Sequence, residues 1–216
     1  MSSVDTSREW VVGLVRASKY LTLSGLLMSL SLLWALICLL SSLVSILATQ
    51  NAFEELQRRV ATLMLNPQLQ VAVLGVVTGF LVSLYAVFAE LIPSLKELEG
   101  YVESLRTSLA LVSIGLILTI TLLTVPITLS PIFYFTSTNP TLYFVLSALP
   151  LGSLITYFVS YLGFLLTYVK LGALTGRSSF TVVGVLLLLS TFIIPVGFIA
   201  WLISFITARD LAKSLL

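Results

Sequence analysis

Apolar residues run almost without interruption through five long segments of the chain. These segments are 21–48, 70–92, 107–129, 142–169 and 180–207. A helix crosses the roughly 30 Å of bilayer hydrocarbon with about 20 apolar residues, and each segment is at least that long. The segments are continuously apolar rather than alternating, which favours helices over the strands of a barrel. The pattern predicts an all-α membrane protein, a bundle of five transmembrane helices with amphipathic connecting helices, in one domain over 1–216.

The charged residues are few and lie outside the centres of these segments. Asp, Glu, Lys and Arg make up 9% of the chain, and there is no His. Haem, copper and zinc sites rest mainly on His and Cys, and ion-coupled transport on intramembrane carboxylates. We therefore expect no enzyme, no cofactor and no metal. The net charge of +2 does not indicate a nucleic-acid partner, whereas facilitated transport of a neutral solute stays open.

The basic residues indicate an orientation. With five spans, seven of the 11 lie on the N-terminal side: Arg8, Arg16, Lys19, Lys96, Arg106, Lys170 and Arg177. Cytoplasmic loops carry an excess of Lys and Arg. This predicts a multi-pass protein of the cell membrane with a cytoplasmic N-terminus and a C-terminus outside, although the basic C-terminal tail counts against it.

A short motif recurs where three of the segments begin. Arg16-Ala17-Ser18, Arg106-Thr107-Ser108 and Arg177-Ser178-Ser179 each precede a glycine within the following helix. A parallel duplication of a helical hairpin, 70–129 and 142–207, would explain the repetition. The alternative is that Arg at a membrane boundary and Ser at a helix start are common in any case.

The two polar connections, 49–67 and 93–106, carry amphipathic patterns. In the second, Ser94 and Glu97 have the spacing of a capping box that would begin a new helix. Each connection is either a docking surface for a partner protein or an interfacial helix lying on lipid or over the bundle.

Small residues at four-residue spacing predict close helix packing, because small side chains let backbones approach in lipid. The sets are Gly75, Gly79 and Ser83; Ala148 and Gly152; and Ala200 and Ser204. The spacing does not decide whether the helices that meet belong to one subunit or to two.

Two prolines within the segments are followed by glycine, as Pro150-x-Gly152 and Pro195-x-Gly197. A proline removes a helical hydrogen bond, so we expect kinks at both sites. The kinks would shape a vestibule or gate, or would only splay two helices to fit their neighbours.

An aromatic stripe follows one face of the fourth segment, through Tyr157, Tyr161, Phe164 and Tyr168. Such a stripe could hold a quinone or a lipid tail, or could be a packing face whose hydroxyls need partners.

Three features carry a resemblance to a class of proteins: the basic amphipathic start from Arg8 to Lys19, the acidic connection from Lys96 to Arg106, and the last segment with Gly184 and Pro195-Val196-Gly197. With them the chain resembles small archaeal multi-spanning membrane proteins that have no assigned activity. The resemblance implies no site residues.

Two functions fit this sequence. The first is a non-catalytic structural or accessory subunit, a scaffold in a larger membrane assembly, with the lipid bilayer and a protein partner or second copy held through helix faces. The second is a small channel or facilitator for a neutral solute or lipid.

Overall fold

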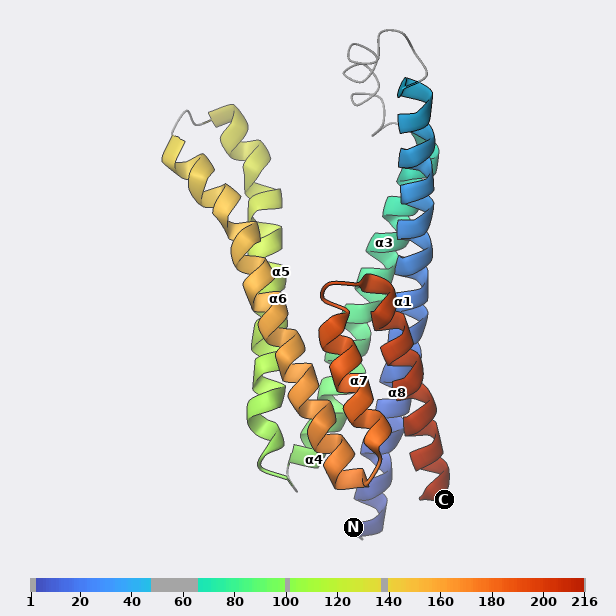
Figure 1. Ribbon diagram of the computed structural model, residues 1–216. Helices are drawn as coiled ribbons and strands as arrows, with labels where there is room; N and C mark the ends of the chain where they lie inside the picture. Colours follow the sequence, from blue (N-terminus) through green and yellow to red (C-terminus); the bar gives the residue numbers. More distant parts are fainter. Residues whose placement is uncertain (1–2, 48–65, 100–101, 137–139, 216) are drawn as a thin grey trace.

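The computed structural model describes residues 3–47, 66–99, 102–136 and 140–215, which are helical almost throughout and form no strand. Figure 1 labels the helices. They are α1 (Ser3–Leu47), α3 (Pro67–Tyr85), the π-helix η1 (Ala86–Leu91), α4 (Ile92–Glu99), α5 (Leu105–Thr136), α6 (Pro140–Thr175), α7 (Ser178–Leu189) and α8 (Ile194–Ser214). Residues 49–65 of the first polar connection lie outside the described ranges.

The predicted fold class is confirmed. Five helical stretches are long and apolar enough to cross a membrane: Glu9–Ser42, Pro67–Glu99, Leu105–Pro126, Ala148–Thr175 and Pro195–Ser214. The first begins well before the predicted residue 21. The reason is packing: the helix extends towards the N-terminus because Val11, Leu14 and Ala17 in the amphipathic start are almost completely buried.

The predicted single helix over 180–207 is wrong. α7 ends at Leu189, the chain turns over residues 190–193, and α8 runs back beside α7 (Figure 1). Pro195 lies in the first turn of α8. It therefore marks the start of a helix rather than a kink within one, since a proline at that position loses no hydrogen bond.

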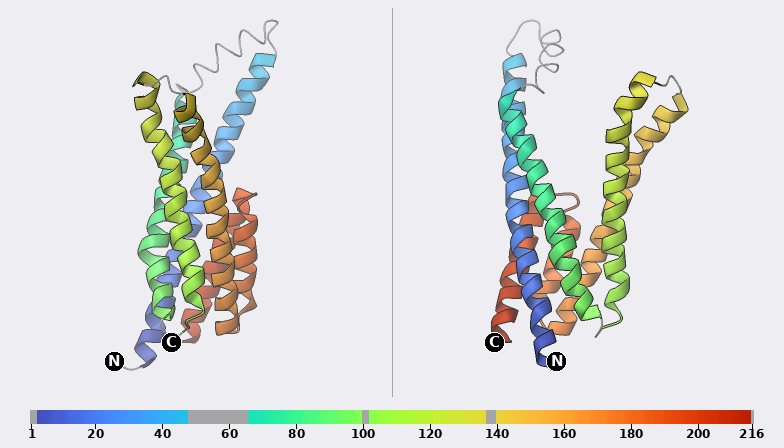
Figure 2. Two further views of the ribbon diagram at one scale, coloured as in Figure 1. Left: turned by 90° about the vertical axis from the view of Figure 1, so that its left-hand side faces the viewer. Right: turned by 180° about the vertical axis from the view of Figure 1, so that it is seen from behind.

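This reversal places the two chain ends at the same end of the bundle in all three views (Figures 1 and 2). The expectation of termini on opposite faces assumed five full crossings and does not hold in this fold. We call this end of the bundle the terminal end.

The two segments of the proposed duplication have different structures. Residues 70–129 lie in two long helices with the α4 turn between them, whereas 142–207 contain one long helix and the short α7–α8 hairpin. The recurring Arg-x-Ser motif does not mark equivalent sites either, because Arg16 lies within α1, 13 residues after its start, whereas Arg177 immediately precedes α7.

The helices form two long pairs joined through the hairpin. α1 packs on α3, and α5 packs on α6. The hairpin fills the space between them near the terminal end, where α8 contacts α1 and α7 contacts α6. Beyond the hairpin the two pairs diverge (Figure 1). The buried core accordingly gathers in the terminal half, around Leu14, Leu91, Tyr168 and Phe180.

The second polar connection continues the preceding helix instead of starting a new one. α3, η1 and α4 are continuous, and the amide of Ile92 bonds to the carbonyl of Val87 in the wider π pattern. Pro93 explains the widening, because its ring would clash with the carbonyl four residues earlier in an α-helix. Ser94 donates to the carbonyl of Glu90 rather than capping, so the predicted capping box is wrong.

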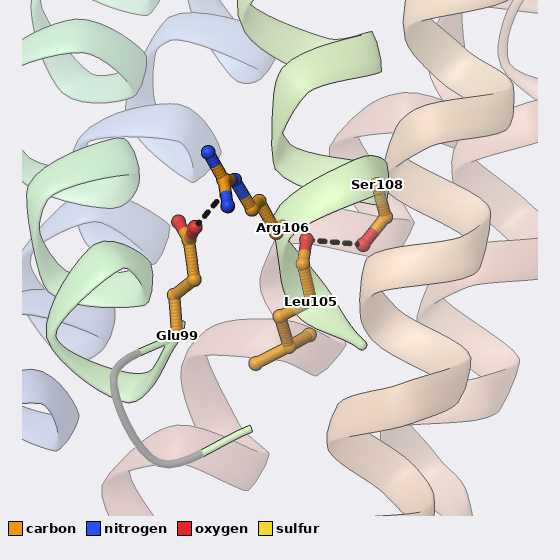
Figure 3. A network of polar contacts seen from close by, with 4 residues as sticks. All are labelled: Glu99, Leu105, Arg106 and Ser108. Carbon is orange, nitrogen blue, oxygen red and sulfur yellow. Dashed lines mark hydrogen bonds and ion pairs between the residues drawn. The ribbon is translucent and has the colours of Figure 1, made fainter. Parts of the chain in front are cut away.

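Polar contacts hold the turn from α4 to α5. Glu99 pairs with Arg106 at 3.8 Å, and the Ser108 hydroxyl donates to the carbonyl of Leu105 at 2.9 Å (Figure 3). Lys170 of α6 donates to the carbonyl of Ser104. An exposed ion pair contributes at most about 1 kcal/mol, so the turn depends chiefly on buried Leu105 and Leu109.

The arrangement predicts that both ends of the chain react from one face of the membrane. In a Cys38→Ser background, S7C and S214C should be labelled by an impermeant maleimide from the same side of sealed vesicles, and T136C, at the far end of α5, from the other side. Labelling of S7C and S214C from opposite faces would contradict the chain reversal.

Candidate intramembrane cavity

Arg177 closes the base of the α7–α8 hairpin. Its guanidinium donates to the carbonyl oxygens of Thr207 at 3.5 Å and Asp210 at 3.2 Å, and to the Ser214 hydroxyl at 3.1 Å. Both carbonyls lie in the last two turns of α8, where the helix dipole favours a cation nearby. A residue just before α7 therefore ties the base of the hairpin to the end of α8.

The turn at the other end of the hairpin satisfies its own backbone. The amides of residues 190–193 all donate to carbonyls of the last turn of α7, within 3.2 Å. The hydroxyls of Ser190 and Thr191 donate to the carbonyls of Leu187 and Leu188, at 2.6 and 2.7 Å. Pro195, near the start of α8, has no amide proton to place. The four amides of the turn therefore need no water as a partner.

Contacts between α1 and α8 fix the height of the turn. A side chain on Gly25 would come within 3.3 Å of the Cα of Phe198, four residues after α8 begins. α1 continues for 22 residues beyond Gly25, to Leu47. At about 1.5 Å per residue, α1 extends about 27 Å further than α8. α7 itself has 12 residues, too few to cross about 30 Å of hydrocarbon.

A partly open cavity of about 140 Å³ lies beside this turn. α1, α3, α6 and the hairpin all contribute to its wall. The lining residues are Leu21, Ser24, Gly25, Met28, Ser83, Tyr157, Tyr161, Ser190, Gly197, Phe198 and Trp201. None of them carries a charge at neutral pH, and five have a hydroxyl group.

Hydroxyls lie on two walls of the cavity. The Ser24 and Ser83 hydroxyls are 2.7 Å apart and join α1 to α3, and Ser24 also bonds to the carbonyl of Leu21 at 2.9 Å. On the other wall, the rings of Tyr157 and Tyr161 lie 4.6 Å apart between centroids, and Ser190 of the hairpin also lines the cavity.

An aromatic layer closes the terminal side of the cavity. Trp201 lies edge-on to Phe164 at 5.8 Å and to Tyr168 at 6.0 Å between ring centroids. Beneath it, the Ser204 hydroxyl lies 2.8 Å from Ser18 and 3.0 Å from Tyr168, linking α8 to α1 and α6. All three of these residues are buried.

The structure brings the predicted aromatic stripe to the hairpin. Tyr157 and Tyr161 line the cavity, whereas Phe164 and Tyr168 pack in the layer below. Beside the stripe, Thr119 of α5 and Thr156 of α6 bond each other at 2.9 Å.

The predicted packing residues fall into two groups. Gly75 and Gly79 contact α1, because a side chain on either would come within 2.5 Å of Ser31 or Met28. Ser83 continues this face. On α8, Ala200 and Ser204 are fully buried.

The second group contacts its neighbours loosely or not at all. Ala148 is exposed, and a side chain on Gly152 would meet only Leu122, at 3.5 Å. α6 continues through Pro150 without a break. Gly197 does not form a kink with Pro195 and instead approaches Ser190, where an added Cβ would lie 3.2 Å from that of the serine.

Ser24, Ser190 and Trp201 are site residues that sequence reasoning missed. Each lies in an apolar run, where a single serine or tryptophan is unremarkable. One signal in the sequence could have indicated the turn. Ser190 and Thr191 stand together at the centre of the last apolar segment, and Ser190 lies five residues before Pro195.

Comparisons of the chain with protein-family models, curated proteins and solved structures find no match. The site therefore has to be interpreted from its own chemistry. Within the described ranges, no three His, Cys, Asp or Glu side chains lie close enough together to hold a metal ion.

The hydroxyl contact at Ser204 predicts a measurable stability effect. S204A should lower the free energy of unfolding in detergent by about 0.6–1.7 kcal/mol, the range for hydrogen bonds between membrane helices, because it leaves the Ser18 and Tyr168 hydroxyls without this partner. T121V is the control, since Thr121 is exposed and bonds only to its own helix. Equal effects of the two substitutions would contradict the assignment.

Proposed function

We propose that this protein is a membrane facilitator for a small neutral solute. The observation that carries the proposal is the α7–α8 hairpin, whose turn lies beside an uncharged, hydroxyl-lined cavity. The proposal takes up the second of the two functions that fit the sequence.

The position of the turn supports this function. Non-helical backbone within hydrocarbon is tolerated where it is buried in protein or lines a cavity. Helices that end near the middle of the bilayer commonly form the substrate sites of transporters. A protein that only held partners together would gain the same outer faces from a fifth full-length helix, without a turn beside Ser190.

The lining of the cavity indicates a neutral solute. Ser24, Ser83, Tyr157, Tyr161 and Ser190 offer hydrogen bonds but no charge. A charged solute would enter a site without a counter-ion, which is costly in a medium of low dielectric constant. On the terminal side, the layer around Trp201 and the Ser204 contacts block the way. The structure therefore corresponds to a closed state, and passage requires this layer to part.

The fold also suggests an orientation. Arg209 and Lys213, in the last turns of α8, join the seven basic residues already assigned to the N-terminal side. With nine of the 11 basic residues at one end, the positive-inside rule favours a cytoplasmic location for both termini. The basic tail, which counted against a cytoplasmic N-terminus when five crossings were assumed, now supports it.

A scaffold is the second candidate, and one observation favours it. None of the main helix–helix contacts in the described part of the chain joins α3 to α5 or α6. The faces of the two long helix pairs beyond the hairpin are therefore available to another protein. Native mass spectrometry of gently extracted protein tests this, and a stoichiometric second polypeptide would support it.

The facilitator makes a direct prediction about flux. Proteoliposomes should swell faster than protein-free liposomes in gradients of glycerol or urea, as followed by light scattering. S83L should abolish the difference, because its side chain fills the cavity. V73L is the matched control, since Val73 lies exposed on the same helix.

Equal swelling rates with and without the protein, for every neutral solute tried, would overturn the proposed function. A faster rate that S83L leaves unchanged would overturn the assignment of the path to this cavity.

A further inference from the structure

The direction of the hydrogen bonds around the cavity limits what it can bind. Each hydroxyl has one proton and two lone pairs. Ser24 gives its proton to the carbonyl of Leu21 at 2.9 Å, so in its 2.7 Å contact with Ser83 it acts as the acceptor. The proton of Ser83 is thereby used, and its oxygen offers the cavity lone pairs only.

The opposite wall follows the same logic. Ser190 gives its proton to the carbonyl of Leu187 at 2.6 Å. The Ser190 oxygen, which also lines the cavity, therefore offers lone pairs only.

Size and wall composition add a second restriction. The remaining lining residues are mainly apolar or aromatic, among them Met28, Phe198 and Trp201. The cavity measures about 140 Å³, and an apolar cavity of about 150 Å³ in another protein holds a benzene-sized molecule. A single six-membered ring therefore fits.

We infer that the cavity binds a neutral, ring-sized molecule that donates a hydrogen bond, of the phenol class, with its ring against Phe198 and Trp201 and its hydroxyl directed at Ser83. The inference rests on the proposed function and names the solute class.

Tryptophan fluorescence tests this binding. In W10F/W34F protein, Trp201 is the remaining tryptophan, and it lines the cavity. The probe is 4-bromophenol, whose bromine quenches tryptophan emission and whose hydroxyl is protonated at pH 7. The matched probe is 1-bromo-4-fluorobenzene, in which fluorine replaces the hydroxyl and donates nothing. Quenching by 4-bromophenol should saturate, with an affinity about 3- to 10-fold above that of the matched probe, as expected for one neutral hydrogen bond.

Two controls separate binding from partition into the micelle. W10F/W201F protein retains Trp34, which is exposed on α1, and its quenching should rise without saturation. S83A should weaken 4-bromophenol binding at least threefold and leave the matched probe unchanged, whereas Y20F, on the outer face of α1, should change neither. Equilibrium dialysis of 4-bromophenol against the unsubstituted protein measures the affinity without any substitution.

Any of three results would overturn the inference: quenching of Trp201 that does not saturate, equal affinity for the two probes, or no more 4-bromophenol retained in dialysis by the protein than by empty micelles. The outcomes also separate it from the facilitator. Saturable binding without flux of any neutral solute would support the binding site and contradict the proposed function. Flux of glycerol without binding of 4-bromophenol would keep the function and remove the phenol class.

Discussion

A polypeptide that turns within hydrocarbon has to supply every hydrogen bond of the turn itself, because no water is present to do so. The amides of residues 190–193 meet this constraint by donating to the last carbonyls of α7, and Ser190 and Thr191 add their hydroxyls. Pro195 then starts α8 without an amide proton. The hairpin can therefore end beside the middle of α1, and the cavity, the aromatic layer and the position of the C-terminus all follow from that.

The remaining helices are shaped to hold this hairpin. Gly25 of α1 lets α8 approach, and Gly184 of α7 lies so close to α6 that a side chain there would come within 3.0 Å of the carbonyl oxygen of Leu165. In lipid, such close contacts and the hydrogen bonds at Ser204 supply the attraction that water supplies in soluble proteins. Arg177 fixes the base of the hairpin, at the end where the charged residues gather. None of the main contacts among the described residues joins α5 or α6 to α1 or α3, and beyond the hairpin the two helix pairs diverge (Figure 1).

The sequence was sufficient for the helical membrane class and four of the five predicted segments, because twenty apolar residues in a row have few other solutions. It did not reveal the hairpin, since the residues around Ser190 are as apolar as those within a helix: a turn in lipid lacks the Gly, Asn and Asp that mark turns in water. The capping box at Ser94 failed for the opposite reason, because a local motif was overridden by the π-helix before Pro93. The predicted stripe did include Tyr157 and Tyr161, while Ser24 and Trp201 became recognisable as site residues only when packing brought four elements together.

The depth of the turn is the measurement that tests this account most directly. Phe192 is 75% exposed at the turn, so a nitroxide on F192C, in a Cys38→Ser background and in a bilayer, should leave the packing undisturbed. Collisions with oxygen and with a water-soluble nickel complex report its depth. The account predicts high oxygen and low nickel accessibility, as for a site deep within the hydrocarbon. Nickel accessibility equal to that of a label at S214C, at the terminal end of the bundle, would show that the turn lies outside the hydrocarbon and would contradict this account.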